Sequence, residues 1–413
     1  MKKSTKGLAG RIAVIVTKES KRNQSKFTEK KIMRVCLICV EIFAWGKYGG
    51  FGRATRLIGR ELANRGVEVF AVVPRREGQK PVEQLDGITV LSYPRYYPFA
   101  AKQLFRECNA DLFHSCEPSF CTYLAMGEFP DRAHMITMRD PRDLEDWKME
   151  FDLPTLGKLQ VLSNFLYEDN FFVRQAVRNA DAVYCVAKCL SEKVKHKYRL
   201  PERPEFLPTP VMVPDRVQKA AKPTVCFLAR WDRRKRPQLF LQLAKEFPDV
   251  HFIAMGNSRD KQWDRHLRNS YAHLPNLEMP GFVDQFHSNL HADILKKSWI
   301  LVNTATREGL PNSFLEAAAH GCAILSAVNP DGFASEFGWH VKDDRFDLGL
   351  QELLHHHHWK EKGLRGQAHV TKTFDITHAI DEHLRRYEQV LSHPRQRQSY
   401  KPIIFHAESY GQS

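Results

Sequence analysis

An apolar strand, a glycine-rich loop, an amphipathic helix and a second apolar strand define the fold class of the first part of this chain. Residues 34–40 read Arg-Val-Cys-Leu-Ile-Cys-Val, a continuous apolar run typical of a strand covered on both faces. A helical pattern over 53–65 and a strand over 67–73 follow a loop that contains Gly46, Gly49, Gly50 and Gly52. This order predicts a parallel sheet with a right-handed crossover.

Alternating strands and helices continue along the chain and divide it into two α/β halves. Short strands are expected over 88–92, 112–115, 134–138 and 182–186, and then over 224–228, 251–255, 299–303 and 323–326. Helical patterns cover 237–246, 312–320 and 376–391. Six prolines between residues 201 and 223 exclude a regular helix there and predict an extended connection between two domains.

The positive charge of the chain is concentrated at its N-terminus. The formal net charge is +14, and residues 1–34 hold eleven Lys or Arg against two Glu. Such an arm can bind anionic lipid or nucleic acid by releasing counterions. The preferred interpretation is a solvated tail, or an upstream extension with the functional start at Met33. Nucleic acid is therefore not an expected partner, whereas peripheral contact with an anionic membrane stays an open alternative.

The nine cysteines are scattered among apolar neighbours, which is typical of reduced thiols in a cytoplasmic protein. Cys36 and Cys39 have CxxC spacing, but both belong to the first apolar run, so we expect buried thiols and not a metal site. No apolar run reaches the roughly 18 residues of a membrane-spanning helix, and no secretory signal is evident. The expected location is the cytoplasm, with membrane association at the inner face left open.

Two acidic residues follow an apolar strand in the second half. Residues 307–316 read Arg-Glu-Gly-Leu-Pro-Asn-Ser-Phe-Leu-Glu, and the Gly-Leu-Pro turn leads into a helix near Asn312. A helix N-terminus at the carboxyl end of a parallel strand suits a phosphate-bearing ligand. Glu308 lies in the loop and Glu316 one turn into the helix. One carboxylate could hold the hydroxyls of a sugar, and the other a ribose diol.

A basic loop follows the strand expected over 224–228. It contains Arg230 and Lys235 within the run Arg-Trp-Asp-Arg-Arg-Lys-Arg. The arginine could bind a diphosphate by two parallel hydrogen bonds and the lysine could act as a point charge. A diphosphate leaving group needs such cations because negative charge builds up on it. Taken alone, the loop would be interpreted as a solvated basic turn.

Together these motifs resemble family 4 of the retaining glycosyltransferases, which have the GT-B fold. The Glu-x7-Glu motif of that family matches Glu308 and Glu316. Its Gly-Arg-x4-Lys motif matches Arg230 and Lys235, with Ala229 in place of the glycine. Segments 49–66, 180–187, 251–256 and 280–283 also match in order. The resemblance covers about residues 34–390 and implies an α/β GT-B fold, with two Rossmann-like domains facing each other across a cleft.

The resemblance implies a role for each matching residue. Glu316 would bind the nucleotide ribose and Glu308 the donor sugar, while Arg230 and Lys235 would bind the diphosphate. Further donor contacts are expected from Gly49, Gly50, Phe282, Val283, Gly309, Leu310, Pro311 and Asn312. Retention would follow from attack on the face that the leaving group departs from. The departing phosphate would take the proton of the acceptor, so no protein nucleophile is needed.

The resemblance fails at one position. Members of the family often carry His before Asp at the end of the strand over 134–138, facing the donor sugar, whereas this chain has Arg139 and Asp140. Arg139 either takes a related sugar-binding or charge role, or this part of the site is modified. Asp140 is expected to bind a sugar hydroxyl or to orient Arg139.

The expected function is a step of polysaccharide or glycoconjugate biosynthesis. A hexose would move from a nucleotide-diphosphate sugar, UDP-linked first and GDP-linked as the alternative, to a glycan, lipid-linked or other hydroxyl acceptor. No metal or other cofactor is expected, because the chain lacks the Asp-x-Asp motif of the other common glycosyltransferase fold. Two alternatives remain: a nucleotide-sugar epimerase of GT-B fold, and a non-catalytic scaffold protein, which the Arg139 substitution suggests.

The expected domain organisation follows the order of the elements. A basic arm covers 1–33, an acceptor-binding Rossmann-like domain 34–200, a proline-rich linker 201–223 and a nucleotide-sugar domain 224–375. A last helix over 376–391 is expected to cross back onto the first domain, before a tail over 392–413. On the first helix, Arg53, Arg56 and Arg60 fall near one face, which is interpreted as solvated in preference to membrane-facing.

Overall fold

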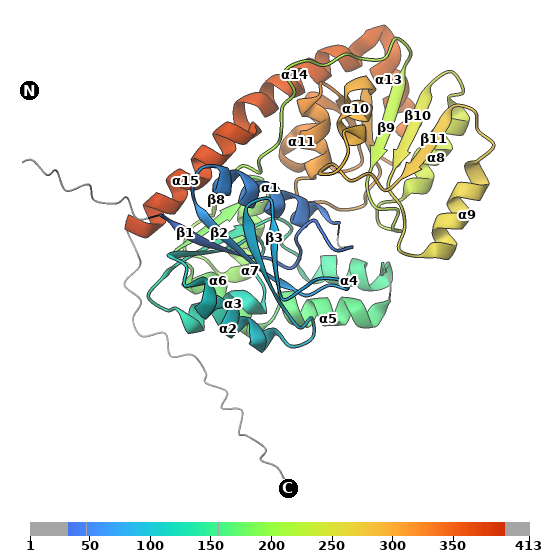
Figure 1. The fold of residues 1–413 in the computed structure, drawn as a ribbon. Helices are drawn as coiled ribbons and strands as arrows, with labels where there is room; N and C mark the ends of the chain where they lie inside the picture. Colours follow the sequence, from blue (N-terminus) through green and yellow to red (C-terminus); the bar gives the residue numbers. More distant parts are fainter. Residues whose placement is uncertain (1–31, 47, 156, 393–413) are drawn as a thin grey trace, which may run out of the picture. The chain divides into compact units, whose positions relative to one another are not determined.

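The computed structural model describes residues 32–46, 48–155 and 157–392 of the chain. These residues form two largely parallel sheets of eight and six strands, flanked by helices (Figure 1). The α/β fold class predicted from the sequence is thereby confirmed. The basic arm and the tail fall almost completely outside the described residues, so their expected roles stay predictions.

The first sheet has the strand order β3-β4-β2-β1-β5-β6-β7-β8, and its neighbours are parallel except for β3, which pairs antiparallel with β4. Its strands are β1 (Arg34–Ile38), β2 (Glu68–Pro74), β3 (Val82–Leu85), β4 (Ile88–Tyr93), β5 (Leu112–Ser115), β6 (Ala133–Met138), β7 (Ala182–Cys185) and β8 (Glu205–Phe206). The accompanying helices are α1 (Gly50–Asn64), α2 (Ala101–Cys108), α3 (Phe120–Glu128), α4 (Leu144–Asp152), α5 (Lys158–Glu168), α6 (Phe171–Asn179) and α7 (Leu190–Tyr198).

The second sheet has the strand order β11-β10-β9-β12-β13-β14 and is parallel throughout. Its strands are β9 (Thr224–Leu228), β10 (His251–Met255), β11 (Leu277–Gly281), β12 (Ile300–Asn303), β13 (Ala323–Ser326) and β14 (Gly338–His340). Its helices are α8 (Pro237–Glu246), α9 (Lys261–Tyr271), α10 (Leu290–Lys297), α11 (Asn312–Ala319), α12 (Phe333–Phe337), α13 (Phe346–Leu354) and α14 (His358–Phe374).

The last described helix, α15 (Ile376–Ser392), packs against α1 and β6 of the first sheet (Figure 1). Its Tyr387 is fully buried, and the phenol oxygen lies 2.8 Å from Nδ1 of His114 on β5. Ile380 and Val390 join the same core as Leu37 of β1. The core of the first sheet is therefore completed by the far end of the chain.

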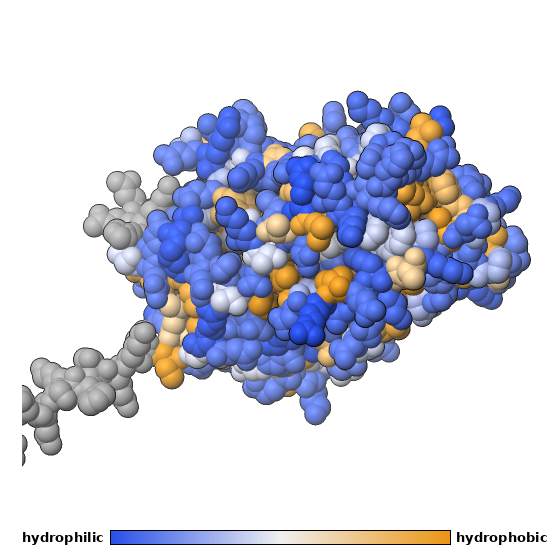
Figure 2. Space-filling view, turned by 90° about the horizontal axis from the view of Figure 1, so that it is seen from above, coloured by the Kyte–Doolittle hydropathy of each residue, from blue (hydrophilic) through white to orange (hydrophobic). Residues whose placement is uncertain are grey.

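The central strands are buried along their length, because helices cover both faces of each sheet. All nine cysteines are free thiols and eight of them are buried. Among the residues that the structure describes, no helix is both long enough and apolar enough to span a bilayer. The face seen in Figure 2 is mainly hydrophilic, with hydrophobic residues in small separate patches.

Candidate active site

Lys235 and Glu308 lie side by side at the carboxyl ends of neighbouring strands. Lys235 follows β9 and Glu308 follows β12, and these two strands pair in parallel, so both loops leave the sheet at one edge. The Lys235 ammonium forms an ion pair with Oε1 of Glu308, and their side chains are only 17% and 19% exposed. The pair therefore places a cation and a carboxylate where open α/β sheets bind ligands.

Short-range hydrogen bonds fix the loop that carries Lys235. Its N–H donates to the carbonyl of Asp232 at 3.0 Å and to Oδ1 of the same residue at 3.1 Å. The Thr304 hydroxyl, just after β12, donates to the Lys235 carbonyl at 2.6 Å. Arg230, earlier in the loop, is 40% exposed, and its nearest carboxylate is that of Asp232 at 3.6 Å. The guanidinium of Arg230 is therefore accessible to an anion.

Glu316, in the second turn of α11, is bound by side chains from helices of both domains, Arg53 of α1 and His291 of α10. Nη1 of Arg53, in the first turn of α1, donates to Oε1 at 2.9 Å and to Oε2 at 2.7 Å. Nε2 of His291 lies 3.4 Å from Oε2. Burial raises the pKa of Glu316, but the charge of Arg53 and the adjacent His291 outweigh burial and lower the pKa to about 2. Glu316 is therefore an ionised, buried carboxylate.

The Arg53–Glu316 ion pair predicts a stability that depends on pH. The pKa in the folded protein, about 2, lies below the ordinary 4.5, so the pair stabilises the fold above pH 4.5 and loses this effect as the pH falls toward 2. The whole effect is about 3 kcal/mol. In urea titrations, we expect the unfolding free energies of wild type and Glu316→Gln to differ by a constant amount near neutral pH. This difference should shrink below about pH 4.5, and an unchanged difference near pH 3 would contradict the ionised pair.

Two of the three arginines of α1, Arg53 and Arg56, face the protein interior. Arg53 is 14% exposed in the ion pair just described. Arg56 is almost fully buried, and it donates through Nη1 to the Phe43 carbonyl at 2.7 Å and through Nε to Asp86 at 2.7 Å. A solvated face and a membrane-facing surface are therefore both wrong interpretations of Arg53 and Arg56.

The glycine loop packs against Glu41 and α11. The Gly52 N–H donates to Oε1 of Glu41 at 3.0 Å, and a β-carbon on Gly49 would lie 1.9 Å from that oxygen. The Gly50 carbonyl accepts a hydrogen bond from Nδ2 of Asn312 at 2.7 Å. Gly50 and Asn312, both predicted as donor contacts, thus meet where the two domains touch.

Asp140 faces the loop of Glu308 and is bound by the preceding residue of that loop, Arg307. Nη1 of Arg307 donates to Oδ2 at 3.1 Å and Nη2 to Oδ1 at 2.6 Å. Burial would raise the pKa of Asp140, but the charge of Arg307 holds it below its ordinary value. A β-carbon on Gly309 would lie 2.2 Å from the carbonyl oxygen of Arg139. The end of β6 and the loop after β12 are therefore in direct contact.

The Arg139 side chain does not join the other predicted catalytic residues. Its Nε donates to the Cys116 carbonyl at 3.1 Å and its Nη1 to the Thr209 hydroxyl at 3.0 Å. The guanidinium is buried, and burial lowers its pKa. It binds the end of β5 to the proline-rich segment, and only the backbone of Arg139 reaches the loop of Gly309.

The remaining predicted donor contacts lie around β11 and the start of α11. Phe282 is 40% exposed and its ring stacks on Tyr48 at a centroid distance of 4.5 Å, whereas Val283 is buried. Leu310 is buried as well, and Pro311 immediately precedes α11. No side chain caps this helix, and the Phe314 N–H donates to the Pro311 carbonyl at 3.0 Å, so the N–H groups of Asn312 and Ser313 remain available to an anion.

Four charged residues near this site have no predicted role in it from the sequence, and they are Arg53, Glu117, His291 and Arg307. Glu117 accepts hydrogen bonds from the backbone N–H of residues 139 and 140, at 2.6 and 3.4 Å, and burial raises its pKa to about 7. Its place just beyond β5 follows the same strand-end rule that singled out Glu308. Arg53 and His291 carry no such signal, because only the approach of α1 and α10 to α11 brings them to Glu316.

Comparisons with known families agree with this architecture. Residues 48–213 match the family Glycosyltransferase Family 4, and residues 214–342 match Glycosyl transferases group 1. The comparison with curated proteins found no significant match.

Solved structures with the same fold cover most of this chain. Sucrose-phosphate synthase from Thermosynechococcus elongatus is 17% identical with a TM-score of 0.66, covering 87% of this chain and 99% of its own. Anabaena HepE, solved with UDP-glucose, is 13% identical with a TM-score of 0.65, covering 86% and 100%. The catalytic domain of Starch Synthase IV from Arabidopsis thaliana, bound to ADP and acarbose, is 12% identical with a TM-score of 0.59, covering 87% and 100%. At these identities the similarity establishes the fold.

Proposed function

This chain belongs to the GT-B glycosyltransferases, and on that premise we propose that it transfers a hexosyl group with retention of anomeric configuration. The donor is a nucleotide-diphosphate sugar and the acceptor a hydroxyl of a glycan, lipid-linked or other molecule. The observation that carries the proposal is the contact of Lys235 with Glu308, in the loop that leads into the helix of the ionised Glu316. The Lys235 ammonium suits a diphosphate, and the carboxylates of Glu308 and Glu316 suit the hydroxyls of a sugar and a ribose.

The donor roles follow from charge and position. Arg230, Lys235 and the uncapped start of α11 supply positive charge for the diphosphate. Glu308 would accept hydrogen bonds from the sugar hydroxyls, and Glu316 from the ribose diol. Phe282, which is 40% exposed, would lie beside the base. The contact between Gly50 and Asn312 would bring the first domain to the donor and exclude water from it.

A same-face mechanism accounts for retention without a protein nucleophile. Asp140 is engaged by Arg307 and Glu308 by Lys235, so both carboxylates serve as fixed charges. The leaving phosphate would accept the proton of the attacking hydroxyl while the cations stabilise its developing charge. Asp140 would orient the loop over 307–312, in place of a direct contact between Arg139 and the sugar.

We also propose that donor binding needs no metal ion, because the cations of this chain can neutralise the diphosphate. The residues that the structure describes bring no three His, Cys, Asp or Glu side chains together in a metal-binding arrangement. Magnesium can still arrive with the nucleotide, so the proposal is tested by measuring nucleotide binding with and without Mg²⁺.

A thermal-shift panel of UDP, GDP, ADP and CDP tests the donor site and identifies the base. A ligand that binds only the folded state raises the melting temperature by mass action. We expect UDP to give the largest shift, with GDP as the alternative, and neither to require Mg²⁺. Two structural neighbours were solved with UDP-glucose and with ADP, which supports nucleotides as the first ligands to test. No shift with any nucleotide at millimolar concentration would overturn the enzymatic proposal.

The two alternative functions are separated by their products. An epimerase would convert the nucleotide sugar without an acceptor, and NMR of the sugar would show the change. A glycosyltransferase without acceptor would only hydrolyse the donor slowly. A non-catalytic scaffold would give neither reaction. The Arg139 side chain is bound to Cys116 and Thr209 and does not replace the histidine that family members often carry beside the donor sugar, so the measurement of donor turnover decides between the enzyme and the scaffold.

Gly309→Ala should separate the two domains at the site and lower turnover by about 100-fold, as misplacements near 1 Å can do. The added β-carbon would lie 2.2 Å from the backbone oxygen of Arg139. A backbone atom cannot move aside as the end of a flexible side chain can. Donor turnover measured beside the melting temperature checks this expectation. Gly157→Ala is the matched control, because no atom lies within 4 Å of its added β-carbon. Equal turnover in both variants would show that the close contact is dispensable.

A further inference from the structure

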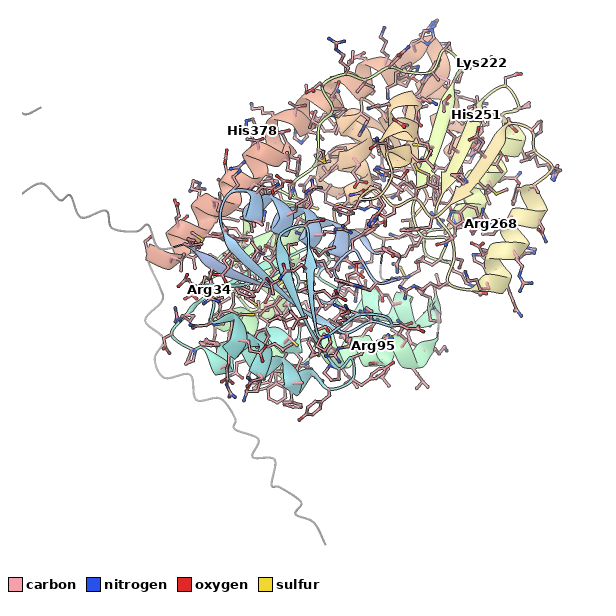
Figure 3. All side chains as sticks on the ribbon, viewed as in Figure 1. Arg34, Arg95, Lys222, His251, Arg268 and His378 are labelled. Carbon is pink, nitrogen blue, oxygen red and sulfur yellow. The ribbon has the colours of Figure 1, made fainter. Side chains whose placement is uncertain are left out.

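A groove of about 470 Å³ lies at the edge of the second sheet, away from the proposed donor site. Its edge strand is β14, and β13 separates β14 from β12, whose following loop carries Glu308. In Figure 3, Lys222 and His251 mark the amino ends of β9 and β10, toward the opposite edge of the same sheet. The groove is lined by residues of β14, the loop after it, α13 and α14, among them Trp339, His340, Lys342, Glu352, His358 and Glu361. We call it the β14 groove.

Trp339 gives the β14 groove a flat apolar surface. The residue is 40% exposed. Its indole packs against α13 where Gly349 leaves room, since a β-carbon added to Gly349 would lie 2.7 Å from Cδ1 of the indole. Within the part of the chain that the structure describes, the indole N–H has no hydrogen-bond partner. A ring that is fixed on one element and partly exposed suits the apolar C–H face of a sugar, and its N–H can donate to a hydroxyl.

Hydrogen bonds between three helices hold the walls of the β14 groove together. Nδ1 of His358, at the start of α14, lies 3.1 Å from Oε1 of Glu352 on α13. Nζ of Lys362 on α14 donates to the carbonyls of Ser335 and Glu336 on α12, at 3.2 and 3.3 Å. The protein itself therefore fixes the shape of the groove, whose volume lies within the roughly 300–1,000 Å³ typical of small-molecule sites.

The charges that line the β14 groove balance one another, because Lys342 and Lys362 stand against Glu352 and Glu361. Lys342 is exposed, its ammonium has no partner among the described residues, and the Glu361 side chain is 74% exposed. An anion would meet two carboxylates here, and a purely apolar ligand would cover the charges without pairing with them. Hydroxyl groups both donate and accept hydrogen bonds, so a neutral ligand rich in hydroxyls matches this lining best.

We propose that the β14 groove binds a neutral oligosaccharide. One sugar ring stacks on Trp339, and Lys342, Glu352 and Glu361 bind its hydroxyls. Because Trp339 and Lys342 are exposed, the ends of a longer chain can extend into solvent. This binding goes beyond the proposed glycosyl transfer and does not depend on it, because the groove and the donor residues belong to different strands. It would keep a long glycan attached to the protein away from the donor site.

The test titrates three neutral hexasaccharides, maltohexaose, cellohexaose and laminarihexaose, into the full chain by calorimetry. Hexagalacturonate, of the same length, is the anionic comparison ligand. The main variant is Trp339→Ala, and its matched control is Tyr96→Ala, which removes an 84% exposed ring from the first domain. Glu352→Gln is a second variant, which keeps the indole and its packing. The melting temperature of each protein is measured with and without nucleotide.

We expect wild type and Tyr96→Ala to bind at least one neutral hexasaccharide. Trp339→Ala should bind it about tenfold more weakly because the stacked ring is lost, and Glu352→Gln about tenfold more weakly because a charged acceptor is lost. If the melting temperature of Trp339→Ala falls, Glu352→Gln decides the outcome.

Wild type that binds none of the three hexasaccharides at millimolar concentration would overturn the proposal. Equal binding by wild type and the deciding variant would also overturn it, by placing the glycan elsewhere on the chain. Tighter binding of hexagalacturonate than of every neutral hexasaccharide would contradict the neutral ligand. The nucleotide-induced rise in melting temperature should be the same in all four proteins, and its absence from wild type would count against the proposed function alone.

Discussion

Lys235→Ala is expected to lower donor turnover by about 10²- to 10³-fold, the usual cost of removing one group that stabilises charge in a transition state. Lys235 is the cation in contact with Glu308, and its loop is fixed by hydrogen bonds from both sides. In the alanine variant, the departing diphosphate lacks this positive charge, and Glu308 lacks its ion-pair partner. Turnover is measured as hydrolysis of the nucleotide sugar that carries the base identified by the thermal-shift panel.

Two measurements separate this effect from misfolding. Lys245→Ala removes the same charge from the exposed end of α8 and should keep wild-type turnover. The melting temperature of Lys235→Ala should remain close to that of the wild type, because the side chain is an ion-pair partner at a strand end and not part of a core. Turnover of Lys235→Ala within threefold of the wild type would rule out its assignment to the diphosphate.

Glu316→Ala is expected to weaken nucleotide binding by about 10- to 100-fold, since hydrogen bonds to a charged group contribute about 1.5–3 kcal/mol each. The carboxylate is ionised, buried and fixed by Arg53 and His291, so it needs little reorganisation to accept a ribose diol. Calorimetric titration with the nucleotide gives the affinity. The variant should also lose most of the nucleotide-induced rise in melting temperature.

Glu388→Gln on the exposed side of α15 is the control for this second result, and it should bind nucleotide like the wild type. The Glu316→Gln variant is informative as well, because it keeps the shape of the side chain and removes the charge. An affinity of Glu316→Ala equal to that of the wild type would place the ribose elsewhere in the molecule.

The sequence predicts the buried parallel strands best, because a strand covered on both faces is apolar at most of its positions. The strands expected over 112–115, 224–228, 251–255 and 323–326 are β5, β9, β10 and β13, with the same bounds. The edge strand β3 was missed, since its four residues alternate between exposed and half-buried. Helix α1 begins at Gly50, three residues earlier than expected, because close packing against Glu41 and Phe43 favours glycine there.

The residues of the candidate site also fall into two groups, those that short sequence motifs indicate and those that depend on distant packing. Glu308, Glu316, Arg230 and Lys235 could be proposed from the sequence, because each lies within one short motif at a strand end, and their roles stay predictions. Arg53 could not, because its role depends on α1 meeting α11 across 263 residues of chain. Arg139 shows the opposite limit: its position suggested a sugar contact, but its side chain found acceptors on Cys116 and Thr209 inside the first domain. Local patterns identify groups at strand ends, whereas side-chain direction depends on distant packing partners.

The packing of α15 has a consequence for synthesis of the chain. Strand β1 is among the first described residues to leave the ribosome, yet Tyr387 and Val390, which cover its sheet, are among the last. Part of the apolar core of the first domain therefore stays uncovered on the ribosome while the whole second domain is synthesised. During that interval the exposed surface is a target for chaperones and for premature association with other chains. A ribosome that stalls after residue 375 would leave a protein with both sheets synthesised but the first one unfinished.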